Sequence, residues 1–374
     1  MATGIDPDYN RLASLIWTHP AIARVREAAS QPVYLVGGAI RDGLADFEVD
    51  DIDLVVEGDP VPLATSLDPD ARINERFGTV NLLVEGEPVD IATARTETYP
   101  RPGALPEVKA GSLEDDLVRR DFTINAMAIG IGRDSELIDP LGGIADLKSG
   151  VLRVLHDKSF VDDPTRALRA ARYAARFGFD LEPKTAELMM TVNTSSVSHD
   201  RLENELRLIA EEDNALEALR LARLWSLVEF EEERLDLAEA ATQLIEVDPW
   251  REDTTREAVI LEAVFGDLQR ATELTIEPAT PWDAVRLARG RTPLELVLGR
   301  ALGGRWLDRW QLEWRWIELE ITGADLLAAG VPEGPQLGEG LDAALEAKLN
   351  YGVSGAEEEM AIALQAAGAE RGAK

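Results

Sequence analysis

Two carboxylates with apolar neighbours lie in the acidic stretch EVDDIDLVVEGD, residues 48–59. Because side chains on a β-strand alternate between faces, Asp51 and Asp53 are predicted to share one face, with Ile52 pointing to the other. Residues two apart on a strand are about 7 Å apart, so both carboxylates can share a hard divalent cation with a triphosphate. Mg²⁺ suits such a pair, since it takes oxygen ligands and completes its shell with water and phosphates.

The same stretch also fits a solvated acidic edge, because the whole chain carries a formal net charge of −32. The remaining carboxylates of the stretch are expected to belong to that surface: Glu48, Asp50, Glu57 and Asp59. Downstream, Asp90 in EPVDIATAR falls on another predicted apolar strand. Asp90 is either the third carboxylate of a two-metal site or only a neighbour of that site.

A glycine pair follows the first apolar strand, in LVGGAIRD. A strand that ends in Gly37-Gly38 and runs into a helix lets backbone amides approach an anion at the helix N-terminus. Arg41, one turn into that helix, adds a charged donor for a phosphate. A tight turn without a ligand is the alternative.

Adjacent charges precede an apolar run in RRDFTINAMA. Arg119, Arg120 and Asp121 can bind a phosphate and a ribose hydroxyl through charged hydrogen bonds. A salt-bridged helix end, with no ligand, fits the same residues.

A basic stripe is predicted in DDPTRALRAARYAARFGF. Pro164 suits the first turn of a helix, with Asp162 or Asp163 as its cap. Four arginines then follow at spacings of three, three and four, which places them on one helix face: Arg166, Arg169, Arg172 and Arg176. Because Asp accepts hydrogen bonds and Arg donates them in a fork, such residues can together read the edge of a nucleobase.

The composition indicates a globular protein with an acidic surface. The chain has 374 residues, 45% of them hydrophobic, and no cysteine, which excludes disulfides and thiolate metal sites and fits a reducing cytoplasm. No apolar run is long enough for a membrane span, and the N-terminus does not resemble a signal peptide. Acidic excess in both halves of the chain favours a high-salt cytoplasm, where counterions screen self-repulsion.

The hydrophobic pattern divides the chain into a small α/β head and a helical remainder. A helix is predicted over residues 7–30, strands over PVYLVGG, DIDLVV and TVNLLVEGEPVDIATA, and a mobile loop over about 96–118. The β-rich part is predicted to end near residue 150. Beyond it, apolar residues recur at helical spacing.

Together these motifs resemble the class II tRNA nucleotidyltransferase and bacterial poly(A) polymerase family, within the polymerase-β-like superfamily. The matching segments occur in the family's order over about residues 33–180, and RLENELRLI at 201–209 resembles the helical motif that follows. They are YLVGGAIRDGL, DIDLVVEGD, VDIATARTETY, RRDFTINAMA, IDPLGGIADLKSGVLRVL and FVDDPTRALRAARYAARFGF. The resemblance implies an α+β protein with a mixed-sheet nucleotidyltransferase head (1–150), a helical neck (151–212), and a helical body and tail (213–374).

The resemblance also implies roles for individual residues. Asp51 and Asp53 would hold the catalytic metals, with Asp90 as a possible third ligand. Asp163 and Arg166 would pair with the incoming base as a protein template, although Asp162 stands where the family usually has Glu. The remaining expected nucleotide contacts are Gly37, Gly38 and Arg41 at the triphosphate, and Arg120, Asp121, Asn125, Arg169 and Arg172.

The implied reaction is template-independent addition of CCA to the 3′ end of tRNA from CTP and ATP, with Mg²⁺ and release of pyrophosphate. The segment ITGADLLAAGVPEGPQLGEGLDAAL resembles the tail of tRNA-end enzymes, which favours tRNA as the partner. Addition of only CC or only the last A, a poly(A) polymerase, and a non-catalytic RNA-binding descendant remain as alternatives. Neither a membrane nor a protein partner is expected.

Overall fold

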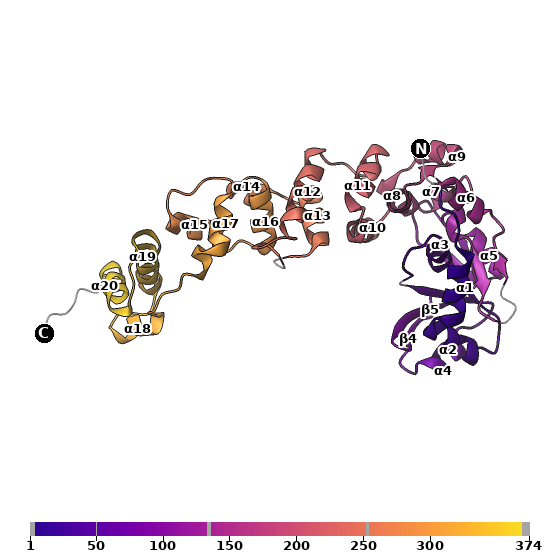
Figure 1. Ribbon diagram of the computed structural model, residues 1–374, viewed down its shortest axis with the longest axis horizontal. Helices are drawn as coiled ribbons and strands as arrows, with labels where there is room; N and C mark the ends of the chain where they lie inside the picture. The colour runs from indigo at the N-terminus through magenta and orange to yellow at the C-terminus, as the bar shows by residue number, and fades with distance from the viewer. Residues whose placement is uncertain (1–3, 50, 133–135, 252–253, 369–374) are drawn as a thin grey trace. The chain divides into compact units, whose positions relative to one another are not determined.

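The computed structural model describes residues 4–49, 51–132, 136–251 and 254–368. The chain forms two compact units, one up to Glu229 and one from Phe230 onward, and each is described by itself. The first unit holds a β-sheet with helices on it, and the second is helical throughout its described residues (Figure 1). This confirms the expected α+β class, a mixed sheet followed by helices.

The sheet of the first unit has seven strands in the order β3-β4-β5-β2-β1-β8-β9. Only β2 and β5 run parallel; every other neighbouring pair is antiparallel, so the sheet is mixed. The strands are β1 Val33–Val36, β2 Ile52–Val56, β3 Arg72–Asn74, β4 Thr79–Val84, β5 Glu87–Thr93, β8 Ala128–Gly130 and β9 Leu137–Ile138.

Alternation along β2 gives its two faces different surroundings. Ile52 and Leu54 are buried on one face, and Asp53 shares the other with Val55. Val55 belongs to an apolar cluster with Leu113 and Leu117 of α5 (Leu113–Val118). Asp53 is therefore held at the edge of a packed apolar layer.

Three short helices pack against the strands of the sheet. Helices α2 (Pro20–Ala28) and α4 (Val61–Leu67) contact β4, while α3 (Gly38–Leu44) contacts β1 and β2. Helix α1 (Tyr9–Thr18) packs on α2 and α3.

The single helix predicted over residues 7–30 is wrong: the segment forms α1 and α2. His19 between them is extended, with φ −67° and ψ 123°, because the residue before a proline is pushed out of the helical region. Pro20 then begins α2, where its missing N–H is not needed.

The mobile loop predicted over about 96–118 is also mostly regular structure. Strands β6 (Arg95–Thr98) and β7 (Glu107–Ala110) pair as an antiparallel hairpin, and α5 follows. The three prolines and one of the two glycines of this segment lie in the hairpin connection, residues 99–106, and the other glycine, Gly111, follows β7. Ser112 begins α5 through a capping box with Asp115, a signal that the sequence carried.

The rest of the first unit is mainly helical. Helices α8, α10 and α11 pack on one another, and β10 pairs with β11 beside them. These elements are η1 Thr123–Asn125, α6 Gly143–Ser149, β10 Val151–Leu152, α7 Ser159–Asp162, α8 Thr165–Phe177, β11 Asp180–Leu181, α9 Pro183–Met189, η2 Thr194–Ser196, α10 His199–Glu211 and α11 Ala215–Leu224.

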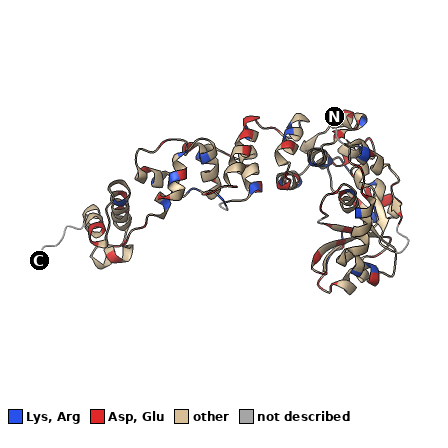
Figure 2. Cartoon of the chain, in the orientation of Figure 1, with Lys and Arg blue, Asp and Glu red and all other residues tan. Residues whose placement is uncertain are grey.

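The second unit has a small apolar core near its end, built around Leu326, Ala344 and Ala363. Its elements are α12 Glu233–Leu244, α13 Arg256–Phe265, α14 Gln269–Glu273, α15 Pro281–Ala288, α16 Pro293–Ala301, α17 Trp306–Leu312, η3 Trp314–Trp316, α18 Gly323–Ala328, α19 Pro335–Tyr351 and α20 Ala356–Ala366. Within the described ranges, no helix combines the length and apolar character that a membrane crossing needs. Acidic residues occur along helices of both units (Figure 2).

Candidate active site

One cavity of about 650 Å³ in the first unit gathers every residue that the sequence singled out as a candidate. The thirteen candidates that line it come from segments up to 135 residues apart, from residue 37 to residue 172. They are Gly37, Gly38, Arg41, Asp51, Asp53, Asp90, Arg120, Asp121, Asn125, Asp163, Arg166, Arg169 and Arg172. The structure therefore brings all the candidates together, whatever each does.

The charge of the lining differs from that of the whole chain. Eight of the lining residues are arginines and seven are Asp or Glu, so the lining is close to neutral in a chain of net charge −32. The four arginines of α8 all reach the cavity, as their spacing predicted. An anion is therefore far less repelled here than at the average surface of the protein.

The strands contribute three aspartates to the cavity. Asp53 lies on β2, and Asp51 directly precedes that strand. Asp90 of β5 is the register partner of Asp53 on the neighbouring parallel strand, and its Oδ1 accepts a hydrogen bond of 2.5 Å from Asn81. Adjacent register positions point to the same face, so Asp90 stands beside Asp53.

The environment of Asp53 fits a cation ligand. Desolvation raises the pKa of Asp53 to about 6; Asp90 and Asp51 add to the rise, while Arg120 and Arg41 oppose it. Within the described ranges, no arginine or lysine forms an ion pair with Asp51 or Asp53. Carboxylates crowded in this way without a paired cation suit a divalent metal ion.

A cluster of three ligands is not preformed. In the part of the chain that the structure describes, no three His, Asp or Glu side chains are grouped so that they alone could hold a metal ion. The donor set that fits is Asp51 and Asp53, with water and phosphate oxygens to complete the shell. Asp90 as a third ligand stays a prediction.

The other carboxylates of the 48–59 stretch are exposed where the structure describes them. Glu48, Glu57 and Asp59 have exposed side chains, and Asp50 lies outside the described residues. Glu57 also has a structural contact, since its Oε1 accepts a hydrogen bond of 2.8 Å from the backbone N–H of Leu113 at the start of α5.

Glycine is required at position 37 both by the backbone conformation and by the neighbouring Arg120 side chain. Its φ is +68°, and a Cβ there would lie 2.6 Å from Nη1 of Arg120. Its N–H donates to the carbonyl of Met127 at 3.2 Å, so this amide is already used. Gly38 begins α3 and has ordinary space, with 3.4 Å from a Cβ to Nη2 of Arg41. The glycine pair thus admits the Arg120 guanidinium to the cavity wall.

Arg41 lies in the cavity wall with most of its donors already engaged. Its fork donates to both carboxylate oxygens of Asp42 at 2.7 Å, and Nη1 donates to Oδ1 of Asn125 at 2.6 Å. The guanidinium also stacks on Tyr173 and Phe177, at 4.8 Å and 5.0 Å from the ring centroids. Asn125 therefore fixes Arg41, a contact that sequence alone did not reveal.

Arg119 and Arg120 form the salt-bridged helix end that was the alternative to phosphate binding, and both also line the cavity. Both pair with Asp116, which is fully buried on α5, at 2.7 Å and 2.9 Å. Burial alone would raise the pKa of Asp116, but the two guanidiniums hold it below its ordinary value. One buried carboxylate therefore orients two cavity arginines.

Asp121 and Arg169 are coupled across the cavity wall. Nε of Arg169 lies 3.0 Å from Oδ2 of Asp121, and Asn125 and the Phe122 N–H donate to Oδ1 at 3.0 Å and 2.9 Å. Burial would raise the pKa of Asp121, but Arg169 and the donor from Asn125 hold it below its ordinary value. Asp121 is therefore an anionic acceptor with one lone-pair position left for a substrate hydroxyl.

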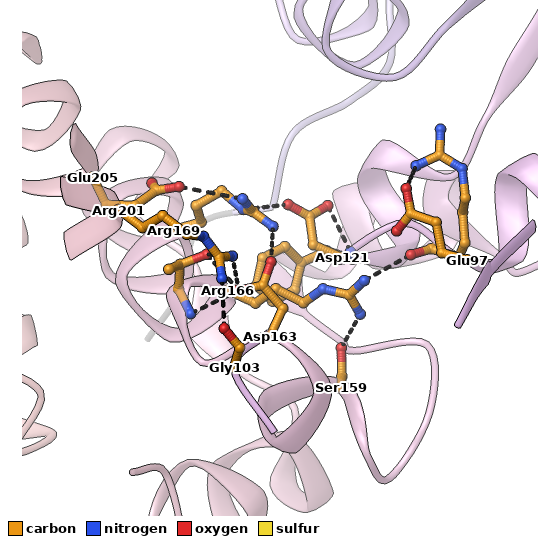
Figure 3. Close-up of polar contacts among 12 residues, drawn as sticks. Glu97, Gly103, Asp121, Ser159, Asp163, Arg166, Arg169, Arg201 and Glu205 are labelled. Carbon is orange, nitrogen blue, oxygen red and sulfur yellow. Dashed lines mark hydrogen bonds and ion pairs between the residues drawn. The ribbon is translucent and has the colours of Figure 1, made fainter. Parts of the chain in front are cut away.

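Asp163 and Arg166 are both buried at the start of α8 (Figure 3). Asp163 caps the helix by accepting from the Thr165 N–H at 3.1 Å, with Pro164 between them, as predicted. Arg166 donates to Oγ of Ser159 and to the backbone carbonyl of Arg119, each at 2.7 Å. The buried Nε of Arg166 has no hydrogen-bond partner among the described residues.

A stripe on β6 was missed by the sequence reasoning. Arg95, Glu97 and Tyr99 alternate onto one face and line the cavity. Glu97 accepts from Arg119 at 2.8 Å and from the Tyr99 hydroxyl at 3.0 Å. Burial raises the pKa of Tyr99 to about 12, which keeps this hydroxyl a donor. Period-two alternation in RTETY could have found the stripe, but the segment was read as a loop.

Helix α10 supplies two more residues that were not predicted. Glu205 accepts from Arg169 at 3.2 Å, and Arg201 donates to Asp163 at 2.7 Å. Both belong to RLENELRLI, whose resemblance was noted without a role. Their partners lie more than 30 residues away, so local spacing could not assign them.

A mixed sheet with aspartates in a cavity that an arginine-rich helix also lines is the arrangement that the resemblance to nucleotidyltransferases predicts. A family model described as Poly A polymerase head domain matches residues 33–153. A CC-adding tRNA nucleotidyltransferase of Deinococcus radiodurans is 32% identical over 355 residues, 87% of either chain. The chain belongs to the family of tRNA nucleotidyltransferases and poly(A) polymerases.

Further relatives carry related names. An A-adding tRNA nucleotidyltransferase of Aquifex aeolicus is 45% identical over 206 residues, 52% of this chain and 25% of that protein. The solved Thermotoga maritima CCA-adding enzyme complexed with tRNA matches with a TM-score of 0.72 and 28% identity over 96% of both chains. The chain spans 25%, 45% and 46% of the lengths of three A-adding relatives, less than half of each.

Proposed function

We propose that this protein extends the 3′ end of tRNA by adding CCA from CTP and ATP. The oxygen of the tRNA 3′-hydroxyl bonds to the α-phosphorus as its proton passes to solvent. The bond between the α-phosphorus and the oxygen that bridges it to the β-phosphate breaks, and pyrophosphate leaves. The observation that carries the proposal is that one cavity is lined both by the aspartates at β2 and β5 and by the base-reading candidates Asp163 and Arg166.

Asp51 and Asp53 would hold Mg²⁺ at the strand side of this cavity. Two-metal chemistry, when Mg²⁺ is bound, stabilises both the attacking and the leaving oxygen of an in-line displacement. Arg120, held by Asp116 beside Gly37, is oriented to meet the triphosphate of the nucleotide. Asp121 would accept a hydrogen bond from a ribose hydroxyl and so favour ribonucleotides.

Base selection would lie with Asp163 and Arg166. Cytosine and adenine both present an exocyclic amino donor, at N4 and N6, where uracil and guanine present a carbonyl oxygen. A carboxylate accepts from the amino group and repels the carbonyl, while Arg166 donates to a ring nitrogen or carbonyl. Burial would raise the pKa of Asp163, but Arg169 and the donor from Thr165 hold it below its ordinary value, so it stays an acceptor.

Arg166→Ala tests this assignment. We expect discrimination between CTP or ATP and the other nucleotides to fall by about tenfold or more, because a buried charged donor to the base is lost. The measurement offers each NTP singly with tRNA and compares kcat/KM. Unchanged discrimination by a folded variant would move base selection to other residues.

Addition of the terminal A alone is a second candidate, because the A-adding Aquifex relative is 45% identical over 206 residues. Purified protein and Mg²⁺ should be incubated with tRNA that ends at the discriminator base, at C or at CC, with CTP and ATP alone and mixed. Full CCA addition predicts extension of all three tRNAs in the mixture. Extension of only the CC-ending tRNA would support the A-adding alternative. If an unstructured RNA is offered in place of tRNA, its extension would support a poly(A) polymerase.

We also propose a cytoplasmic location at high salt, and Mg²⁺ as the metal. The net charge of −32, with acidic side chains spread over both units, supports salt adaptation (Figure 2). Salt should raise the melting temperature of the protein over the range in which it screens this charge. A melting temperature that does not change with KCl concentration would argue for an ordinary acidic protein.

A further inference from the structure

We infer that Arg201 of α10 is a positioning residue that selects which oxygen of Asp163 faces the nucleobase. This inference rests on the proposed function, since it assumes that Asp163 reads the base. Arg201 is not among the residues that line the cavity within the described ranges. It acts through Asp163, from behind the cavity wall.

The two oxygens of Asp163 have unequal surroundings. Oδ1 receives three donors: the Thr165 N–H at 3.1 Å, the Thr165 hydroxyl at 2.6 Å and Nη2 of Arg201 at 2.7 Å. Oδ2 has only a long contact of 3.6 Å to Nη2 of Arg169. A carboxylate oxygen has about two lone-pair sites, so Oδ1 is saturated and Oδ2 is the oxygen left for a base amino group.

Arg201 adds to Asp163 what the helix cap alone lacks. The Thr165 contacts come from the first residue of α8, and both are made to Oδ1 of the carboxylate. Arg201 reaches it from another helix, 38 residues along the chain, and brings a charged donor at 2.7 Å. Charge-assisted hydrogen bonds are roughly twice as strong as neutral ones, so this contact resists rotation of the carboxylate.

The same guanidinium is anchored by the β6–β7 connection. Nη1 of Arg201 donates to the carbonyl of Gly103 at 2.9 Å, and the Gly103 N–H donates to the Asp162 carbonyl at 3.2 Å (Figure 3). Gly103 has φ +70°, and a Cβ there would lie 2.6 Å from the Ser196 carbonyl oxygen. The connection is thus closely packed, and the Arg201 guanidinium is held between two acceptors, the Gly103 carbonyl and Oδ1 of Asp163.

Two charged residues of α10 pair with residues of opposite charge in the cavity wall. Arg201 neutralises Asp163, and one turn further along the helix Glu205 accepts from Arg169 at 3.2 Å. Arg169 in turn pairs with Asp121 at 3.0 Å. Removing Arg201 leaves Asp163 with Arg169 as its remaining ion-pair partner, on Oδ2. We therefore expect the carboxylate to turn toward Arg169 and to lose the alignment of its free acceptor.

The test compares Arg201→Met with Arg207→Met. Arg207 lies on the same helix, with its side chain exposed and paired with Glu211, so it controls for loss of one arginine from α10. Each variant is given tRNA with CTP, ATP, UTP or GTP singly. For R201M we expect the KM for CTP and ATP to rise about tenfold and the preference for CTP over UTP to fall by a similar factor. R207M should match the wild type.

A purely structural role would lower kcat equally for all four nucleotides and leave the CTP to UTP ratio unchanged, and that result would overturn the inference. R201K keeps one charged donor without the fork, so it should recover part of the ratio. If R201M does not fold by circular dichroism, R201Q, which keeps a neutral donor, is expected to show the same loss. Wild-type protein that extends no tRNA would instead refute the proposed function itself.

Discussion

The cavity has a strand wall, with Asp51 and Asp53, and a helix wall, with Asp121 and Asp163. The carboxylates of the two walls differ in whether they are paired with arginine. On the strand wall, Asp51 and Asp53 form no ion pair with any described residue. On the helix wall, Asp121 has Arg169 and Asp163 has Arg201. Behind that wall, the buried Asp116 pairs with Arg119 and Arg120, which line the cavity. We therefore expect the strand wall to accept a cation from outside, whereas the helix wall already has its arginines in place.

This difference indicates which wall changes during a reaction. Paired charges on the helix wall are pre-organised donors and acceptors, so they can select a base without rearranging. Burial raises the pKa of Asp53 to about 6, so its unpaired carboxylate carries a desolvation cost that a bound metal ion would offset. We therefore expect substitutions on the strand wall to act on turnover, and those on the helix wall to act on stability and selection.

Asp53→Asn should have the largest effect. Loss of one carboxylate from the strand wall should lower kcat for tRNA extension by at least about a thousandfold, with tRNA affinity unchanged, because it removes one of the two proposed metal ligands. Glu48→Gln, an exposed carboxylate of the same stretch, is the control and should leave kcat unchanged. Near-normal extension by D53N would remove the functional distinction between the walls.

Asp116→Asn should remove the buried negative charge that pairs with Arg119 and Arg120. We expect the free energy of unfolding to fall by about 3 kcal/mol, since two half-buried arginines lose their charged partner. Urea unfolding followed by circular dichroism measures it, with the exposed Glu114→Gln on α5 as control.

The effect of D116N should also depend on pH. The pKa of Asp116 is lowered by its arginines, so its stabilisation is present above about pH 4 and fades as pH falls through the lowered value. The gap between wild type and variant should therefore narrow in acid. A gap below about 1 kcal/mol at neutral pH would show that the pairing is not what holds this wall.

Gly37→Ala should have the smallest effect of the three, acting where the two walls meet. A side chain at φ +68° and ψ −127°, a sparsely populated region, costs about 1–3 kcal/mol, and its Cβ would press on Arg120. Gly38→Ala is the matched control, because it lies in a helix with ordinary space and should be neutral or slightly stabilising. Equal unfolding free energies for the two variants would contradict the close approach of Arg120.

Much of the site was predictable because its residues follow local periodicities. Period two placed Asp53 opposite Ile52 on β2, and spacings of three and four put the α8 arginines on one face. The same rules failed over residues 7–30, where Pro20 interrupts the helix, and over 96–118, where prolines hid a hairpin. In both segments, proline positions were weighed wrongly.

The sequence by itself determined the α+β class, the family and thirteen of the residues that line the cavity, because each depends on short-range spacing or on ordered motifs. Only the tertiary structure decided which of these residues are paired. Arg41 with Asn125 and Arg201 with Asp163 are contacts across 84 and 38 residues, and chain spacing has no information on them. The physical reason is that alternation fixes which face a side chain occupies, whereas packing of separate elements fixes what it meets there.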